Sequence, residues 1–528
     1  MCRLEISNTI VEAARSPMKL PSPARAFLVL GCLIALAATT LHADSARRNL
    51  LVIQTDEHNF RTLGAYRALL PYDQAYPWGD GIKVKTPHID WLAHHGAIAD
   101  RAYATSPVCT PSRAAMMTGH YPQNTGSIKN DLPMWDHMVT YGEELRRQGY
   151  ATGYAGKWHL DGMGKPQWEP KRSFGWEDNR YMFNRGHWKN LTIEKDGPRV
   201  GALNKNGGPD YGLAGADEES FTTDFLANRT IDFIREHAGE AFAYHVCIPD
   251  PHGPNTVRPP YDTMYTDLDF QLPKSASVGQ DLPAYAQTLA YQHNPKILSQ
   301  YFGMVKCIDD NIGRIIDALR EEGILENTII VFTSDHGDLL GEHGRDNKGV
   351  PMEGSARIPF IMHAPGLVEP GLVVREPFGT VDFKPTLLSL LGIIDPIENE
   401  GRDYSSFFTT GEAPTDWEHI TFVRNGGHSK TAAGDFKPDN GWIGAFSRQY
   451  KFVVGSSAPP VLFDLEEDPN ELTNLVRSAT HRDTIRRLAI ALERYAKTYQ
   501  EPQLASPQIQ ADLAWAISDR IEYNEYSP

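Results

Sequence analysis

The sequence has few cysteines and no excess of basic residues. Of its 528 residues only five are Cys, and three remain if Cys2 and Cys32 are removed with an N-terminal leader. An odd number of Cys in an exported chain argues against a disulfide framework. The 51 Lys and Arg face 67 Asp and Glu, which gives a net charge of −16 and argues against nucleic acid as a partner. A site for an anion must therefore be a local basic pocket.

Long apolar runs that suit a membrane span are also lacking. The run 26–40 follows a basic segment and is short for a span, and Ala43 ends a suitable cleavage site. We therefore expect 1–43 to be a signal peptide, with Met18 as the true start. The mature chain would be periplasmic or secreted, without an integral membrane span. An uncleaved N-terminal anchor is one alternative, and lipidation at Cys32 is a weaker one.

The rest of the chain alternates between strand and helix patterns. Over roughly 350 residues, apolar β-branched runs alternate with amphipathic helical patterns, which indicates an α/β fold with a mostly parallel sheet. We predict a large mostly parallel sheet flanked by helices over 44–415. Short antiparallel strands and one amphipathic helix then predict a smaller C-terminal sheet-plus-helix subdomain over 416–528.

A long segment inside the α/β part has weak periodicity. Residues 161–217 are rich in Gly, Trp, Asn and Lys, which predicts a functional insertion. Trp168, Trp176 and Trp188 lie within it. Their flat rings could face a sugar, and the alternative is that they belong to the core.

Two predicted buried strands end in groups that can bind a metal. Asp56 and Glu57 end the first strand, and Asp335 and His336 end a later one. Ligands of parallel sheets bind beyond the carboxyl ends of the strands. Clustered carboxylates repel one another unless a cation joins them, and oxygen ligands suit Ca²⁺, Mg²⁺ or Mn²⁺. A His among the ligands favours Mn²⁺ or Zn²⁺ instead. The alternative is that these residues are helix N-caps and turn residues.

Several cations and histidines stand in loops and at strand ends. Lys157 and His159 share a face if their segment is extended. His252 lies between prolines, and Lys348 and Glu353 lie in the stretch RDNKGVPMEGSARIP. Taken singly, each of these residues is as readily explained as a surface or structural residue.

The stretch SPVCTPSRAAMMTG raises the sharpest question. Pro111 fixes φ, and the SRAAMMTG that follows starts a predicted helix whose N-terminus lies over Cys109. That field would lower the pKa of a thiol and make it reactive. The alternative is a buried inert Cys, which is also how we interpret Cys247 and Cys307.

These motifs together resemble a known family. PVCTPSRAAMMTG resembles the Cys-x-Pro-Ser-Arg signature of type I sulfatases, members of the alkaline-phosphatase-like superfamily, and GYATGYAGKWH is similar to their second signature. VIQTDEH, PDPHGP, TIIVFTSDHGDLLGEHG, NKGVPMEGSARIPFI and DFKPTLLSLLGI follow in the family's order. VLFDLEEDPNELTNL matches the family's C-terminal subdomain, so the resemblance covers 49–499.

The resemblance implies that a maturation enzyme oxidises Cys109 to formylglycine. The hydrate of this aldehyde has two hydroxyls on one carbon. One hydroxyl attacks sulfur and releases the alcohol, and the other, once deprotonated, expels sulfate and regenerates the aldehyde.

The resemblance also implies one Ca²⁺, with Mg²⁺ or Mn²⁺ as less favoured ions. Asp56, Asp335 and His336 would hold it together with the formylglycine hydrate. Glu57 stands where the family usually has a second Asp, and its longer reach leaves its mode of ligation open. Glu353 is expected to pair with a nearby cation rather than to take part in the chemistry.

The remaining roles are carried over in the same way. Arg113 would hold the hydrate, and Lys157 and Lys348 would neutralise the sulfate. His159 would contact the hydrate and is the candidate base, and His252, with Lys348, is the candidate acid for the leaving alcohol.

The sequence therefore predicts an exported sulfatase that acts on a sulfated small molecule or glycan, with a sulfated carbohydrate preferred. One alternative is a phosphonate monoester or phosphodiester hydrolase of the same superfamily. The other is a non-catalytic glycan-binding pseudoenzyme, in which Cys109 would stay unmodified.

Overall fold

The computed structural model describes residues 47–277, 282–283, 292–426, 441–520 and 522–523. The chain divides into two units, Met1–Arg47 and Arg48–Pro528, and the second carries the fold described below. The signal peptide predicted for 1–43 lies outside the described residues. No helix among the described residues is both long enough and apolar enough to cross a membrane.

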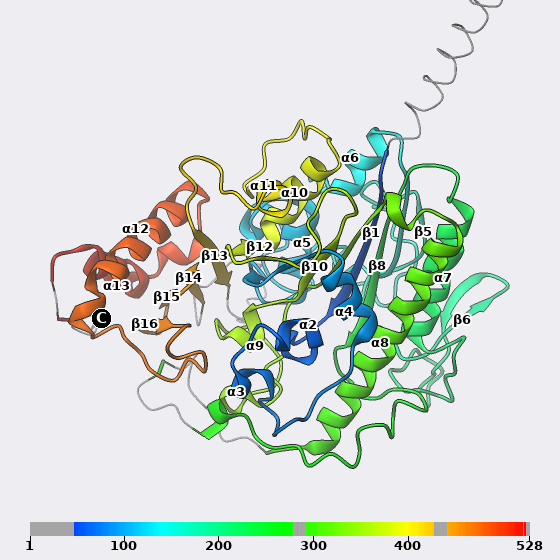
Figure 1. Ribbon diagram of the computed structural model, residues 1–528, viewed down its shortest axis with the longest axis horizontal. Coiled ribbons are helices and arrows are strands. Elements are labelled where there is room, and N and C mark those ends of the chain that lie inside the picture. Colours follow the sequence, from blue (N-terminus) through cyan, green and yellow to red (C-terminus); the bar gives the residue numbers. More distant parts are fainter. Residues whose placement is uncertain (1–46, 278–281, 284–291, 427–440, 521, 524–528) are drawn as a thin grey trace, which may run out of the picture. The chain divides into compact units, whose positions relative to one another are not determined.

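An eight-stranded sheet forms the centre of the fold (Figure 1), with strand order β11-β2-β10-β9-β1-β8-β4-β5. Its strands are β1 (Asn49–Asp56), β2 (Ala97–Ala99), β4 (Ala151–Lys157), β5 (Asp178–Phe183), β8 (Phe242–Pro251), β9 (Thr328–Ser334), β10 (Phe360–His363) and β11 (Leu372–Val374). All neighbours are parallel except those of β10, which runs antiparallel to β2 and β9. The predicted mostly parallel sheet is confirmed.

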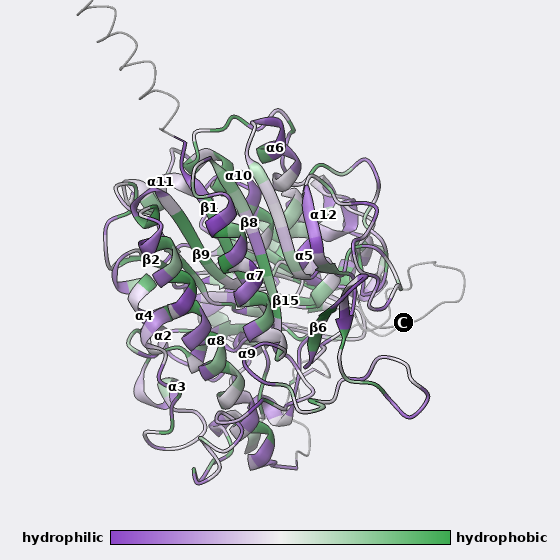
Figure 2. Cartoon of the chain, turned by 90° about the vertical axis from the view of Figure 1, so that its right-hand side faces the viewer, coloured by the Kyte–Doolittle hydropathy of each residue, from purple (hydrophilic) through white to green (hydrophobic). Residues whose placement is uncertain are grey.

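Helices cover both faces of this sheet. On β1, Leu50 and Val52 join one apolar cluster and Leu51 and Ile53 join the other, because successive side chains of a strand point to opposite faces. The first cluster includes residues of α5 (Cys109–Thr118), α6 (Tyr141–Arg147) and α10 (Phe383–Leu390). The second includes residues of α4 (Pro87–His94), α7 (Thr222–Glu236) and α8 (Pro295–Glu321). Figure 2 shows mainly apolar strands between helices with polar outer faces.

A four-stranded antiparallel sheet follows near the C-terminus, as predicted. It consists of β13 (Ile420–Asn425), β14 (Trp442–Ser447), β15 (Tyr450–Gly455) and β16 (Ala458–Asp464), with α12 (Arg482–Thr498) and α13 (Pro507–Ile517) beside it. Met352 and Tyr103 of the α/β part pack in one apolar cluster with Trp442 and Val453. Ala115 of α5 packs in another with residues of α12 and α13. The small sheet therefore shares its core with the helix that begins at Cys109.

The remaining elements are short. They are α2 (Gly64–Arg67), α3 (Tyr72–Ala75), β3 (Ala102–Tyr103), β6 (Leu191–Glu194), β7 (Gly197–Val200), α9 (Glu353–Ala356), β12 (Phe378–Gly379) and α11 (Ser405–Thr409).

Three local predictions need correction. Helix α5 begins at Cys109 itself and not after Pro111, because a proline is tolerated in the first helical turn, where its missing N–H has no partner to lose. The predicted insertion 161–217 contains β5, an edge strand of the main sheet, as well as the β6–β7 hairpin. Trp176 and Trp188 are core residues, 1% and 2% exposed, so their rings cannot face a sugar.

Candidate active site

The predicted metal-binding residues meet at the carboxyl edge of the main sheet. Asp56 ends β1, and Asp335 and His336 follow β9, which pairs with β1 in parallel. Helix α5 brings Cys109 to the same edge. One ligand atom from each of these four buried residues lies within 4.8 Å of all the others.

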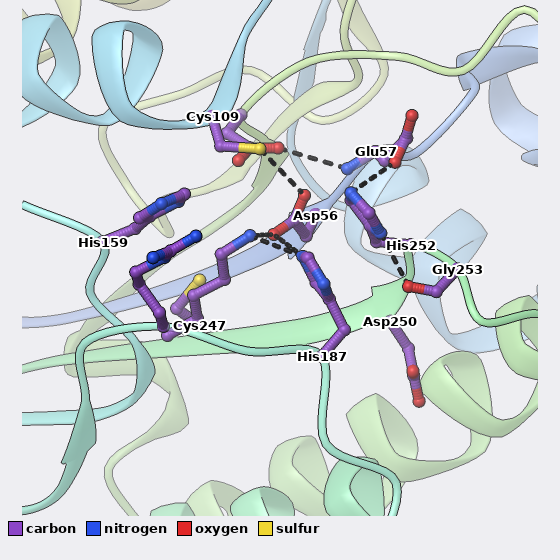
Figure 3. Close-up of polar contacts among 12 residues, drawn as sticks. Asp56, Glu57, Cys109, His159, His187, Cys247, Asp250, His252 and Gly253 are labelled. Carbon is purple, nitrogen blue, oxygen red and sulfur yellow. Dashed lines mark hydrogen bonds and ion pairs between the residues drawn. The ribbon is translucent and has the colours of Figure 1, made fainter. Parts of the chain in front are cut away.

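Three of the distances within this group run to His336 Nε2. This atom lies 3.2 Å from Cys109 Sγ, and Cys109 Sγ lies 3.9 Å from Asp56 Oδ1, a contact drawn in Figure 3. His336 Nε2 is 3.7 Å from Asp56 Oδ1 and 3.6 Å from Asp335 Oδ1. His336 Nδ1 donates to the Gly337 carbonyl at 3.0 Å, so Nε2 is the ring nitrogen that faces the other three ligand atoms. Two carboxylates and such an imidazole are a donor set that fits a divalent cation.

Arg113 ties the two carboxylates together. Its Nη2 lies 3.1 Å from Asp56 Oδ2 and 2.8 Å from Asp335 Oδ2, and the residue is buried. Its Nη1 donates to the Lys157 carbonyl at 2.8 Å and contacts Cys247 Sγ, also at 2.8 Å. Cys247 is thus buried, as expected for a core residue, but it also contacts the arginine of the site.

Lys157 adds a second buried cation at the end of β4. Its Nζ pairs with Asp56 Oδ2 and lies 2.7 Å from His187 Nε2. Burial raises the pKa of Asp56, but Lys157, His252 and Arg113 outweigh it and hold the pKa well below its usual value. Burial also raises the pKa of Cys109, and the positive charges, Lys157 first, lower it well below that of an ordinary thiol. The environment therefore stabilises negative charge at position 109.

Glu57 lies apart from the four-atom group. Its Oε2 is 2.8 Å from both His252 Nε2 and Lys348 Nζ, which are 2.7 Å from each other. Burial raises the pKa of Glu57, but these two cations lower it to about 2. Burial lowers the pKa of His252, and Glu57 raises it to about 10. Glu57 Oε1 is buried and has no hydrogen-bond partner among the described residues, so it remains available as a ligand atom.

His187 belongs to the site and was missed by the sequence analysis. Its ring stacks on that of His252 with centroids 3.5 Å apart and planes 7° apart. Its Nε2 lies 3.7 Å from Asp56 Oδ2. Burial, followed by the charge of His252, lowers its pKa well below the usual value. A single His in the irregular segment between β5 and β6 carries no motif that could have identified it.

The site is buried on one side and open on the other. Asp56, Asp335 and His336 have no exposed surface, whereas the side chains of His252, His187 and Lys348 are 15–18% exposed. Because Glu57 joins the two carboxylates, three negative charges face four cations, which are Arg113, Lys157, Lys348 and the protonated His252. A divalent cation would make the site more positive, which suits an anionic group entering from the open side.

The other predicted residues take the following places. His159 follows β4, is 6% exposed and contacts Asp131. Glu353 pairs with Lys451 at 2.8 Å and with Arg101 at 3.3 Å, so the prediction that it pairs with a cation is confirmed. Cys307 is buried in α8, as expected for a core residue.

Comparisons with known proteins agree with this geometry. Residues 48–393 match the Sulfatase family, and 341–498 match the C-terminal family of N-sulphoglucosamine sulphohydrolase. An ulvan-active sulfatase of Formosa agariphila is 27% identical over 456 residues, covering 85% of this chain and 81% of the relative.

Solved structures share the fold. The structure of BT4656 in complex with its substrate D-glucosamine-2-N,6-O-disulfate matches with a TM-score of 0.68 and 20% identity, over 87% of this chain and all of that one. A phosphonate monoester hydrolase of Agrobacterium radiobacter matches with a TM-score of 0.65 and 24% identity, over 88% and 96% of the two chains. Since the family match spans more than half of the sequence, the chain belongs to the sulfatase family and is a sulfuric ester hydrolase.

Proposed function

We propose that this sulfatase is exported and removes sulfate from a sulfated carbohydrate, using formylglycine made from Cys109 and a bound divalent metal. The observation that carries the proposal is the position of Cys109 at the start of α5, within 4.8 Å of ligand atoms of Asp56, Asp335 and His336.

Asp56, Asp335 and His336 would hold the metal, and the unpartnered Oε1 of Glu57 would be a further ligand. We favour Ca²⁺ over Mg²⁺ because Ca²⁺ accepts more oxygen ligands in a less regular geometry, and Mn²⁺ is the alternative that the imidazole allows. When bound, the cation would polarise the sulfate oxygens and lower the pKa of a coordinated hydroxyl.

A maturation enzyme would convert Cys109 to formylglycine, whose hydrate supplies the hydroxyl nucleophile. Lys157 and Lys348 would neutralise the sulfate from two sides of the site. Arg113 would keep the two carboxylates in register and hold the hydrate between them. His252 would give a proton to the leaving alcohol, because it is the cationic imidazole on the open side and Lys348 contacts its Nε2 at 2.7 Å.

The rim of the open side suits a sugar. Tyr211 lies beside His187, with ring centroids 6.1 Å apart, and the Lys165 ammonium lies 4.4 Å from the centre of the Tyr211 ring. Aromatic and cationic side chains around a polar site fit a sugar that carries negative groups. Together with the relatives that act on ulvan and on a sulfated glucosamine, this supports a sulfated glycan. We propose that one ring at a chain end enters the pocket.

The basic segment and apolar run before Ala43 support export to the periplasm or the medium. Fractionation of cells that express the full chain, with N-terminal sequencing of the product, tests this. A mature N-terminus at residue 44 is expected, and an uncleaved chain retained in the membrane would contradict it.

The phosphonate monoester hydrolase shares the fold, so the two reaction types have to be compared directly. The matured enzyme should hydrolyse 4-nitrophenyl sulfate faster than 4-nitrophenyl phenylphosphonate or an aryl phosphodiester, and should release sulfate from members of a panel of sulfated oligosaccharides. Cys109→Ala is the matched control and should be inactive on all of them. A preference for phosphonate would overturn the sulfatase activity, and activity on aryl sulfate alone would overturn the glycan substrate.

A further inference from the structure

The carboxylate of Asp131 contacts His159, the candidate base of the site. Asp131 belongs to none of the sequence motifs. His159 Nε2 lies 2.9 Å from Asp131 Oδ1. Asp131 is fixed against the first turn of α5, because its backbone N–H donates to Thr110 Oγ1 at 3.4 Å. The preceding side chain, Asn130, accepts from the Thr110 N–H at 2.9 Å. The pair of Asp131 and His159 therefore sits beside the residue that follows Cys109.

This contact decides which imidazole nitrogen carries the proton. A hydrogen bond from His159 is the main cause that lowers the pKa of Asp131, and burial opposes it. Asp131 is thus a carboxylate, which can only accept, so His159 Nε2 must donate. In the neutral imidazole Nδ1 is then a proton acceptor. His159 Nδ1 is buried and has no hydrogen-bond partner within the described part of the chain.

We propose that Asp131 is a positioning residue that holds His159 as the Nε2–H tautomer, so that Nδ1 accepts the proton of the hydrate hydroxyl at position 109. The inference rests on the proposed function. In this step the O–H bond breaks, its electron pair stays on oxygen and the proton moves to Nδ1. The imidazolium that forms is stabilised by the Asp131 carboxylate, which is the role of an aspartate behind a catalytic histidine.

His252 differs from His159 in the contacts of its two ring nitrogens. His252 Nδ1 donates to the Gly253 carbonyl at 2.8 Å, and its Nε2 is held between Glu57 and Lys348. Both of its nitrogens are engaged, whereas His159 keeps one free. The two histidines are therefore suited to opposite tasks, proton donation by His252 and proton acceptance by His159.

Arg185 limits how strongly Asp131 can act. Its Nε lies 2.9 Å from the same Oδ1 that His159 contacts. Sharing one oxygen between two donors keeps the carboxylate ionised and tempers its pull on the imidazole proton. Asp131 therefore orients His159 without taking its proton.

The tautomer can be observed without any turnover. The full chain, made without the maturation enzyme and labelled with ¹⁵N-histidine, should show His159 as the Nε2–H tautomer by NMR, with its resonance identified by its loss in His159→Gln. Glycine tolerates the positive φ of 69° at position 131. In Asp131→Gly, His159 should lose its preference for the Nε2–H tautomer. Asp136→Asn is the matched control, since Asp136 lies in the same loop with its side chain 85% exposed, and should keep it. An Nδ1–H tautomer in the unsubstituted chain would overturn the proposal whether or not Asp131→Gly folds.

Kinetics give an independent readout in the matured enzyme. With 4-nitrophenyl sulfate, Asp131→Asn and Asp131→Gly should lower kcat by about 10²-fold and lower KM with it, because steps up to phenol release are spared. A burst of 4-nitrophenol followed by slow turnover should appear, and Asp131→Glu should restore part of kcat. An equal loss in kcat and kcat/KM would contradict the proposal. If no sulfate ester is hydrolysed at all, the proposed function fails while the tautomer result stands.

Discussion

The two sides of the reaction centre are held in place in different ways. Asp56 and Asp335 stand at the ends of paired, fully buried strands, and Arg113 joins them from α5. On the open side, His252 directly follows β8, Lys348 stands in a loop, and both remain partly exposed. The register of the main sheet thus fixes the metal side and the start of the His252 loop, whereas the rest of the leaving-group side depends on what packs against its loops.

The C-terminal sheet holds the loop of Lys348. The Gly349 carbonyl accepts from Asn425 Nδ2 at 2.6 Å and from Trp442 Nε1 at 3.1 Å. Lys451 Nζ donates to the carbonyl of residue 351 at 2.7 Å. All three donors belong to β13, β14 or β15. A subdomain whose described residues supply no side chain to the reaction centre therefore places one of its cations.

The segment between β5 and β6 holds the other loop. The fully buried Lys189 pairs with Asp250 and lies 3.3 Å from the His252 carbonyl, and His187 stacks on the His252 ring. The leaving-group side is therefore held from two directions, by the C-terminal sheet and by the segment between β5 and β6. Substitutions on the two sides should have different signatures.

The largest loss is expected on the metal side. Asp335→Asn should reduce kcat/KM by about 10³-fold and the bound metal measured by elemental analysis, because Arg113 keeps only one carboxylate partner and a ligand is lost. Breaking a buried ion pair should also cost about 3 kcal/mol of stability. Glu501→Gln, which breaks the buried Arg424–Glu501 pair of the C-terminal part, should lose similar stability but keep its metal. Full metal content in Asp335→Asn would contradict the assignment.

A smaller and substrate-dependent loss is expected on the leaving-group side. His252→Gln should slow hydrolysis of a sugar sulfate by about 10²-fold but that of 4-nitrophenyl sulfate only slightly, since nitrophenolate leaves without a proton. Rates over a series of phenol leaving groups measure this. His237→Gln, at a partly exposed His paired with Glu240, is the control and should follow the unsubstituted enzyme. A uniform loss over the series would remove His252 from the role of acid.

Removal of Lys451, which anchors the Lys348 loop, should have an intermediate effect on kcat/KM. Lys451→Met should lower kcat/KM by about 10-fold and again more for poor leaving groups, because Lys348 loses its fixed position. Arg424→Met removes another buried cation of the same sheet, one that pairs with Glu501. It should destabilise the chain comparably while leaving the leaving-group dependence unchanged. If both variants show the same leaving-group dependence, the sheet stabilises the chain but does not position Lys348.

The last and smallest effect is on the pH dependence of stability, and it concerns Glu471. Its Oε1 lies 2.7 Å from Lys451 Nζ, which makes it the second carboxylate paired with this lysine. Burial raises its pKa to about 7, Lys451 opposes this, and Glu353 adds to it. Because the folded chain binds this proton more tightly than the unfolded chain, Glu471 favours folding at low pH and stability falls as the pH rises toward 7. Glu471→Gln should remove about 2 kcal/mol of this fall between pH 5 and 8, as measured by denaturant unfolding. An unchanged pH dependence would contradict the assignment.

The same division explains what could be predicted from the sequence. Asp56, Asp335, His336 and Cys109 were predictable because buried strands and a helix start have strong local patterns, and parallel strands bring their ends together. The resemblance added the sulfatase signatures. His187 and Lys451 were not predictable, since each acts through a tertiary contact, a ring stack or a hydrogen bond to a carbonyl, that leaves no local pattern.

Glu57 shows a further limit of the sequence pattern. Its place next to Asp56 predicts that both residues bind the metal. Its backbone, however, adopts a positive φ of 64°, and its Oε2 contacts His252 and Lys348. Only Oε1 remains for a metal. The side to which a side chain points at a strand end depends on such backbone detail, which residue identity does not encode.

Mass spectrometry of the peptide that contains Cys109 tests the central claim most directly. The protein should be made with a maturation enzyme, and its sulfatase activity should be measured on the same sample. The account predicts an aldehyde in place of the thiol, in a fraction that rises in proportion to the activity. An active preparation in which Cys109 remains an unmodified thiol would contradict it.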